Sequence, residues 1–244
     1  AVVVLEPTMF EEPKNDFLQK VRKIVDQNNS MLVLDEIVTG FRFDIGGAQK
    51  FFNIKGDITC FGKGMSNGLP LSAVTGPTEF MKVFDDLWVS STNNSDALSI
   101  AGSKAVITEM IEKNTIEHCW NIGKKMFYGW NKIAEENGIN AKMAGYPIRM
   151  DLKCYDDRGI ESISMKSFIL QEMVKQGIFM SILGASYISY SHSVQDIENT
   201  LQAFENTCKF ISKNVVENNY EKFLEGEQPK TIWSMKIPPT KRHY

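Results

Sequence analysis

The chain has 244 residues, of which 43% are hydrophobic and 23% are charged, an ordinary balance for a globular protein with one large domain and a smaller one. Its net charge of -3 gives no general attraction to nucleic acid or to an anionic membrane, so neither is expected as a partner. Four scattered cysteines and three histidines without metal-binding spacing predict no zinc site and favour a reducing, cytoplasmic setting.

The first third of the chain is predicted to alternate strands with helices, which is an α/β pattern. Apolar residues at the start of the chain, a helical apolar face over residues 16–28 and an apolar run over residues 31–34 predict strand, helix and strand. Residues 58–61 and 71–75 are the next predicted strands. Near-continuous apolar strands of this kind are typical of a mostly parallel sheet that is buried on both faces.

The remainder is predicted to hold helices and short strands that form an α+β small domain. The last helix begins after Ser193, and its apolar residues alternate spacings of four and three. A long helix ends at Gly138, the residue type expected after a helix end. The predicted elements are helices over residues 97–112, 116–137 and 166–175 and strands over residues 147–152, near Ile178 and over residues 187–190.

Two of the predicted strands are followed directly by a functional side chain. The run 31–34 ends in Asp35, and Lys63 follows the run 58–61. Because ligands in an open α/β sheet bind beyond the strand ends, this carboxylate and this amine can face one pocket. A lysine in an apolar pocket can attack a carbonyl group and form a Schiff base.

An apolar strand that ends in an Asp-Glu pair is also typical of the metal-binding strand of nucleotide hydrolases. Their phosphate loop needs four residues between its first glycine and the Gly-Lys pair, with Ser or Thr after the lysine. Here five residues separate Gly56 from Gly62, and a further glycine, Gly64, follows the lysine. This spacing excludes a nucleotide hydrolase of that kind.

Four motifs occur in order, over residues 35–42, 46–49, 56–63 and 67–76. They resemble the class III (ω-) aminotransferases, a family of pyridoxal-phosphate-dependent enzymes, and most of all the glutamate-1-semialdehyde aminomutase branch. The resemblance is dense over residues 1–110 and traceable to residue 205. It implies a fold-type I pyridoxal-phosphate transferase with an incomplete large domain over residues 1–138, a C-terminal α+β small domain over residues 139–220 and an extended tail over residues 221–244.

Four residues match those that hold pyridoxal 5'-phosphate in the family. The resemblance implies that Lys63 forms the internal aldimine and then moves protons at the substrate carbon, while Asp35 pairs with the pyridine nitrogen. Ile37 matches the aliphatic residue under the cofactor ring. Thr92 matches the threonine that reaches the cofactor phosphate of the neighbouring subunit, which implies a homodimer.

Each of these residues also has an interpretation without a cofactor. Asp35 can be an ion-paired acid at a sheet edge, and Lys63 can belong to a solvated turn. Ile37 can be a core residue, and Thr92 can belong to a helix N-cap. Their occurrence together and in order favours the cofactor site.

The resemblance also implies a segment that precedes the strand at Ala1 in the family and supplies the cofactor-phosphate loop and an aromatic ring over the pyridine. We therefore expect the chain to be truncated at its N-terminus, as a fragment, a cleavage product or one piece of a split enzyme. Two functions stay open. One is the transfer of an amino group between a small-molecule amino donor and a carbonyl acceptor, as an aminotransferase or an aminomutase. The other is a non-catalytic fragment or subunit that needs an N-terminal half in trans.

Overall fold

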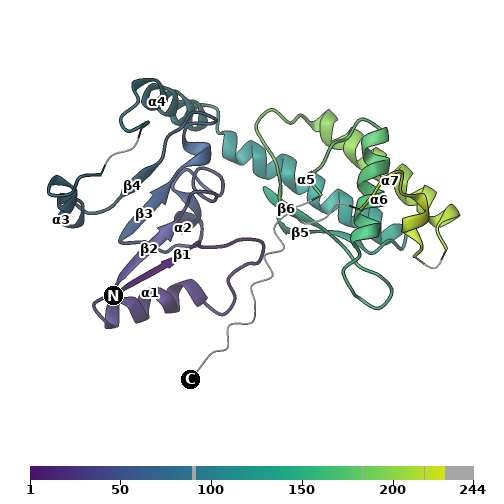
Figure 1. The fold of residues 1–244 in the computed structure, drawn as a ribbon, viewed down its shortest axis with the longest axis horizontal. Coiled ribbons are helices and arrows are strands. Elements are labelled where there is room, and N and C mark those ends of the chain that lie inside the picture. Colours follow the sequence, from purple (N-terminus) through teal and green to yellow (C-terminus); the bar gives the residue numbers. More distant parts are fainter. Residues whose placement is uncertain (90–91, 183, 217, 229–244) are drawn as a thin grey trace. The chain divides into compact units, whose positions relative to one another are not determined.

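The computed structural model describes residues 1–89, 92–182, 184–216 and 218–228, which divide into two compact units (Figure 1). The first unit contains Ala1–Phe127, Gly145–Met150 and Tyr187–Val194. The second unit contains Tyr128–Ala144, Asp151–Ser186 and the described residues from Gln195 onward. Within these ranges, no helix is both long enough and apolar enough to cross a membrane.

The described part of the first unit contains a four-stranded sheet in the order β1 (Val2–Leu5), β2 (Met31–Asp35), β3 (Ile58–Phe61) and β4 (Ala73–Thr75). The first three strands are parallel, and α1 (Phe17–Gln27) carries the chain from β1 to β2 (Figure 1). The strand, helix and strand predicted at the start of the chain are therefore confirmed, as is the α/β class.

The apolar face of α1 packs on the middle of this sheet. Leu32 and Leu34 of β2 are 1% and 0% exposed and share a buried cluster with Val25 of α1. Burial of each such side chain stabilises the fold by about 1.5–3 kcal/mol. This packing fixes β2, and with it the position of the residues that follow the strand.

The predicted mostly parallel sheet has one antiparallel strand. β4 runs antiparallel to β3, with Thr59 opposite Thr75. The chain between these strands contains only the 3₁₀ turn η1 (Lys63–Met65), whereas a parallel return requires a longer crossover, usually a helix. The sheet is also not buried on both faces in the described residues, because Val2 and Val4 of the edge strand β1 are 57% and 66% exposed.

Helices follow the sheet in the chain. α4 (Ala97–Glu112) and α5 (Thr115–Glu136) confirm the two helices predicted there, and Gly138 after α5 has a φ of 66°, which glycine adopts without strain. Three further elements were not predicted because they are too short to show a helical period. They are α2 (Gly47–Phe51), α3 (Thr78–Met81) and the 3₁₀ turn η2 (Lys82–Asp85).

The remaining strands form a second sheet in the order β5 (Ala141–Tyr146), β6 (Arg149–Cys154) and β7 (Ser186–Tyr187). β6 confirms the strand predicted near residue 147, whereas β5 was missed. β7 retains only the beginning of the strand predicted over residues 187–190.

The helices α6 (Ile163–Lys175) and α7 (Val194–Asn214) confirm two further predictions, but the strand expected near Ile178 is wrong. Gly177 has a φ of 81°, and the Ile178 N–H donates to the Met173 carbonyl at 3.0 Å. Ile178 therefore closes the C-terminal cap of α6.

The core of the second unit includes an aromatic pair. Trp130 of α5 stacks on Phe204 of α7 with ring centroids 3.5 Å apart, and its indole N–H donates to the Ala141 carbonyl at 3.0 Å. Cys208 is buried one turn along α7 from Phe204. The 3₁₀ turn η3 (Tyr220–Phe223) occupies the start of the predicted tail, of which residues 229–244 lie outside the described residues.

Candidate functional site

The two residues that sequence analysis singles out follow neighbouring parallel strands. Asp35 is the last residue of β2 and pairs in register with Cys60 of β3. Lys63 comes two residues after the end of β3 and begins η1. Because parallel strands end at the same edge of a sheet, both residues lie where α/β proteins bind ligands.

The backbone at Lys63 is strained. Its φ is 43°, in the left-handed region that side chains other than those of Gly, Asn and Asp rarely adopt. Among the described residues, the other two such positions are Phe41 and Ser95. Phe41 lies in the motif that begins at Asp35, and Ser95 lies three residues after Thr92, so all three strained positions are close to predicted site residues. Strain of about 1–3 kcal/mol per residue is typical of functional sites.

The Asp35 carboxylate is held by the backbone of the loop that follows it. Its Oδ1 accepts a hydrogen bond from the Ile37 N–H at 3.0 Å, and the residue is half-buried. Burial raises the pKa of the neighbouring Cys60 thiol, and the negative charge of Asp35 raises it further. Asp35 forms no ion pair within the described residues, which excludes its interpretation as one half of an ion pair there.

Ile37 brings the two motifs together. A Cβ added to Gly62, the residue before Lys63, would lie 3.6 Å from Ile37 Cγ2 and 3.8 Å from Ser72 Cβ. The Ile37 side chain therefore lies against the backbone from which Lys63 projects. The Lys63 side chain itself is exposed, so the described residues of its unit do not enclose it in the apolar pocket that the sequence led us to expect.

Glu36 is a site residue that sequence analysis did not single out. Its carboxylate is fully buried and accepts three hydrogen bonds, from the Thr39 hydroxyl at 2.5 Å, the Ala48 N–H at 2.9 Å and the Gln49 N–H at 2.6 Å. A Cβ on Gly47 would lie 2.6 Å from a Glu36 oxygen, which explains the glycine. Glu36 thus anchors the loop after Asp35 to the start of α2. The signal in the sequence was an acid beside Asp35 followed by a Gly-Gly pair.

Gly40 allows the two motif loops to approach each other. Its N–H donates to the Glu36 carbonyl at 2.8 Å, and a Cβ there would lie 2.6 Å from that oxygen and 2.7 Å from the Phe61 ring. No side chain fits in this space. In the part of the chain that the structure describes, no group of three His, Cys, Asp or Glu side chains could hold a metal ion.

Thr92 lies in an exposed turn before α4, but it does not cap that helix. The N-cap is Asp96, whose Oδ2 accepts from the Ser99 N–H at 2.8 Å and from the Ser99 hydroxyl at 2.6 Å. The helix-cap interpretation of Thr92 is therefore wrong, and its neighbour Ser91 lies outside the described residues.

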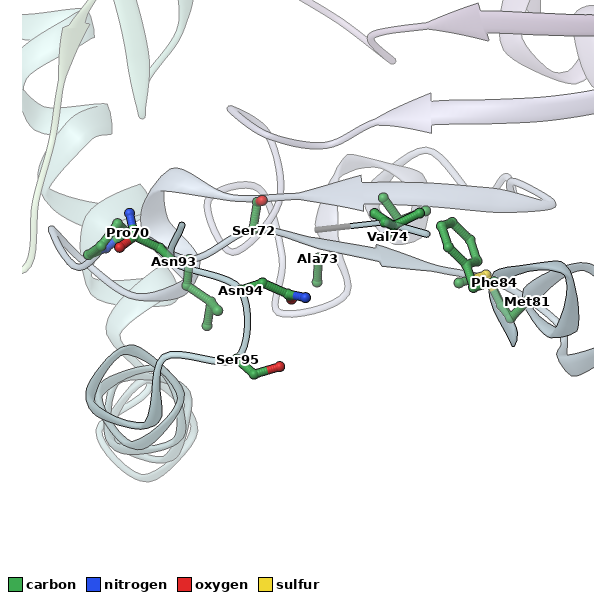
Figure 2. Close-up of a pocket in the computed structure, with 11 residues that line it drawn as sticks. Pro70, Ser72, Ala73, Val74, Met81, Phe84, Asn93, Asn94 and Ser95 are labelled. Atoms are coloured by element: carbon green, nitrogen blue, oxygen red, sulfur yellow. The ribbon is translucent and has the colours of Figure 1, made fainter. Parts of the chain in front are cut away.

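The turn after Thr92 forms one wall of a pocket of about 660 Å³ (Figure 2). Asn93, Asn94 and Ser95 face Ser72, Ala73 and Val74 across it, with Met81 and Phe84 at one end (Figure 2). Ser72 also lies beside Ile37 at the Gly62 backbone. Ser72 therefore connects this pocket to the loop that carries Lys63.

Comparison with known proteins agrees with these motifs. The class-III aminotransferase family model matches residues 1–207. The chain is 29% identical over 225 residues to glutamate-1-semialdehyde 2,1-aminomutase of Alkaliphilus oremlandii, with 87% of this chain and 53% of the relative covered. It is 30% identical over 205 residues to 3-aminobutyryl-CoA aminotransferase of Cloacimonas acidaminovorans, with 82% and 49% covered.

Solved structures share the fold. The pyridoxal-phosphate internal aldimine form of FumI from Sphingopyxis sp. MTA144 has a TM-score of 0.79 at 21% identity, covering 87% of this chain and 52% of FumI. A β-phenylalanine aminotransferase from Variovorax paradoxus has a TM-score of 0.76 at 21% identity, covering 89% and 54%. The chain spans about half the length of the curated relatives it matches. The resemblance predicted from the motifs is confirmed, and the chain belongs to the class-III aminotransferase family.

Proposed function

We propose that this chain takes part in pyridoxal-phosphate-dependent transfer of an amino group, with Lys63 as the cofactor-binding and proton-transferring residue. The observation that supports the proposal is that Asp35 ends β2 and Lys63 comes two residues after the adjacent parallel strand β3. Family membership and relatives named as an aminomutase and an aminotransferase support it.

The residues present fit this cofactor. Asp35 offers a carboxylate that has no ion-pair partner in the described chain, as required of a group that pairs with a protonated ring nitrogen. Ile37 offers an aliphatic surface beside Gly62 for one face of the ring. The Lys63 amine is exposed and forms no hydrogen bond or ion pair among the described residues, so it is free to bind an aldehyde.

When bound, pyridoxal phosphate supplies an aldehyde for covalent attachment and a ring that takes up electrons as the substrate carbon loses its proton. Asp35 would favour the protonated ring nitrogen through its negative charge. Lys63 would take the proton from the substrate α-carbon with Nζ and deliver it to the cofactor carbon that had carried the aldehyde. In an aminotransferase the amino group passes to a separate carbonyl acceptor, and in an aminomutase it returns to the same molecule.

We propose that the protein acts as a homodimer in which Thr92 of one subunit reaches the cofactor phosphate held by the other. Support comes from large apolar side chains that are exposed around the Thr92 turn, including Trp88 at 94%, Leu98 at 68% and Val89 at 57%. Large apolar side chains exposed in one stretch of chain are consistent with an interface there. The four free cysteines support a reducing, cytoplasmic setting.

One observation favours a second candidate, in which this chain is not catalytic alone and works only when a further segment is supplied in trans. The Lys63 side chain is exposed, and exposed β1 valines leave an apolar strand face uncovered. A reactive site normally excludes water. A further segment over the strand ends beside Lys63 would supply that enclosure.

The absorbance spectrum of the purified chain with added pyridoxal phosphate, before and after borohydride reduction, tests the proposal. We expect an absorbance band from cofactor bound to the chain. After reduction, the cofactor should stay covalently attached to the peptide that contains Lys63. Lys63→Ala should abolish the fixed adduct, and the control Lys55→Ala, which removes another exposed lysine, should leave it unchanged. An adduct retained in Lys63→Ala would contradict the assignment. No adduct with the wild-type chain would favour the second candidate.

A further inference from the structure

A second, smaller pocket of about 380 Å³ lies in the first unit beside the loop that carries Lys63. Gly64 and Asn67 from that loop line it together with Gly40 and Phe41 from the Asp35 motif. Neither Lys63 nor Asp35 lines this pocket, so a ligand there lies beside the proposed amino-transfer site, and a part for it in that reaction rests on the proposed function.

The pocket contains a partly buried arginine that forms no ion pair with any described residue. Arg42 lines it, and the Arg42 Nε atom is inaccessible to water and has no hydrogen-bond partner. The guanidinium carbon lies 4.4 Å above the centre of the Tyr187 ring, which holds the side chain in place. Each of the other described arginines, Arg22, Arg149 and Arg158, contacts a carboxylate.

Arg42 stays positively charged in this pocket. Burial lowers the pKa of the Arg42 guanidinium, Tyr187 and Cys119 raise it, and the positive charge of Arg149 lowers it, but an arginine stays protonated in proteins. Thr115 and Ile116, at the N-terminus of α5, also line the pocket, and the first N–H groups of a helix have no partner within the helix. None of the lining residues is acidic.

A partly buried guanidinium without a carboxylate partner can gain a charge-assisted hydrogen bond from an anion that enters the pocket. We propose that this pocket binds the carboxylate group of a small organic acid, with Arg42 as its counter-ion. The guanidinium fork matches the two oxygens of a carboxylate. The rest of the lining suits a short carbon chain, because Phe41, Ile148 and Ile188 supply apolar walls.

A single guanidinium favours this singly charged group over phosphate, which carries more charge and usually meets several cations. The proximity of the pocket to the Lys63 loop places such a carboxylate next to the proposed reaction site. Arg42 is then a specificity-determining residue, and the ligand is an acid with a small apolar body.

The proposal is tested by isothermal titration of the purified chain, without cofactor, with sodium acetate and with sodium succinate, at an ionic strength held constant with sodium chloride. We expect saturable binding at one site per chain. Arg42→Gln should weaken it by about tenfold or more, the loss expected for one hydrogen bond to a charged group. Arg42→Lys, which keeps the charge and loses the fork, should also weaken it. The control Arg158→Gln, which removes an exposed arginine, should bind like the wild type.

A second measurement uses only the wild-type chain and therefore does not depend on the folding of a variant. The Arg42 Nε–H resonance should shift on addition of acetate and saturate at the same midpoint as the calorimetric titration. The proposal is overturned if that resonance does not move, if neither acid binds, or if Arg42→Gln binds as the wild type does. Tighter binding of sodium phosphate than of either acid would overturn the carboxylate assignment.

Discussion

Replacement of Glu36 by glutamine tests how the Asp35 loop is held. The Glu36 carboxylate accepts hydrogen bonds from Thr39, Ala48 and Gln49, and its residue is 0% exposed. A glutamine amide has one acceptor oxygen and one NH₂ group, so at least one backbone N–H of α2 would then face another donor. The Thr39 hydroxyl can rotate to accept instead.

The cost follows from these contacts. A hydrogen bond to a charged group contributes about 1.5–3 kcal/mol, and a buried donor left without a partner costs about 1–3 kcal/mol. We therefore expect Glu36→Gln to lower the free energy of unfolding by about 3 kcal/mol, a large part of the 5–15 kcal/mol typical of a protein domain.

Urea denaturation followed by tryptophan fluorescence measures this loss, and hydrogen exchange locates it at the amides of Ala48 and Gln49. Glu112→Gln, at the exposed end of α4, makes the same chemical change on the surface and should alter stability by less than about 0.5 kcal/mol. A Glu36→Gln loss as small as that of the control would refute the anchoring of this loop through α2.

Three further predictions concern the same structure. Gly40→Ala should destabilise the chain by about 1–3 kcal/mol, because its Cβ would meet a backbone oxygen at 2.6 Å, whereas Gly64→Ala, with its nearest atom at 3.9 Å, should be close to neutral in thermal unfolding. Asp35→Asn should weaken pyridoxal phosphate binding about tenfold in an absorbance titration and slow transamination, and near-normal turnover would count against the ring-nitrogen role. Burial raises the pKa of the Cys208 thiol from 9.0 to about 12, so its contribution to stability is complete below pH 9 and is lost as pH rises toward 12. In urea denaturation across this range, Cys208→Ala should make the loss of stability less steep, by about 1 kcal/mol per pH unit, and an unchanged slope would contradict the buried thiol.

The helices and the parallel strands could be predicted because their apolar periods are long and regular. Residues 16–28, for example, show the apolar face that α1 packs on the sheet. The direction of β4 could not be predicted, because it depends on how the short chain after β3 turns back. The strand predicted at Ile178 was wrong because an apolar side chain does not reveal the hydrogen bond of its backbone N–H. That N–H donates to the Met173 carbonyl at the C-terminus of α6.

The candidate site could be predicted only as far as its motifs reach. Asp35, Ile37 and Lys63 were found because they stand at strand ends and match a family pattern. Glu36 was missed because its role depends on N–H groups of a five-residue helix that the sequence pattern did not predict. Arg42 was interpreted as part of a turn. Its contacts depend on tertiary structure, because the ring that its guanidinium lies over belongs to Tyr187, far away in the chain.

The adjacency of β2 and β3 has a consequence for how the protein acquires its proposed function during folding. Asp35 pairs with Cys60, and all residues of β2, β3 and Lys63 lie in the continuous stretch 31–63. Contacts of low sequence separation form early, because little loop entropy is lost in making them. The acid and the lysine can therefore reach their relative positions as soon as this stretch has left the ribosome, before α4 to α7 exist to pack around it.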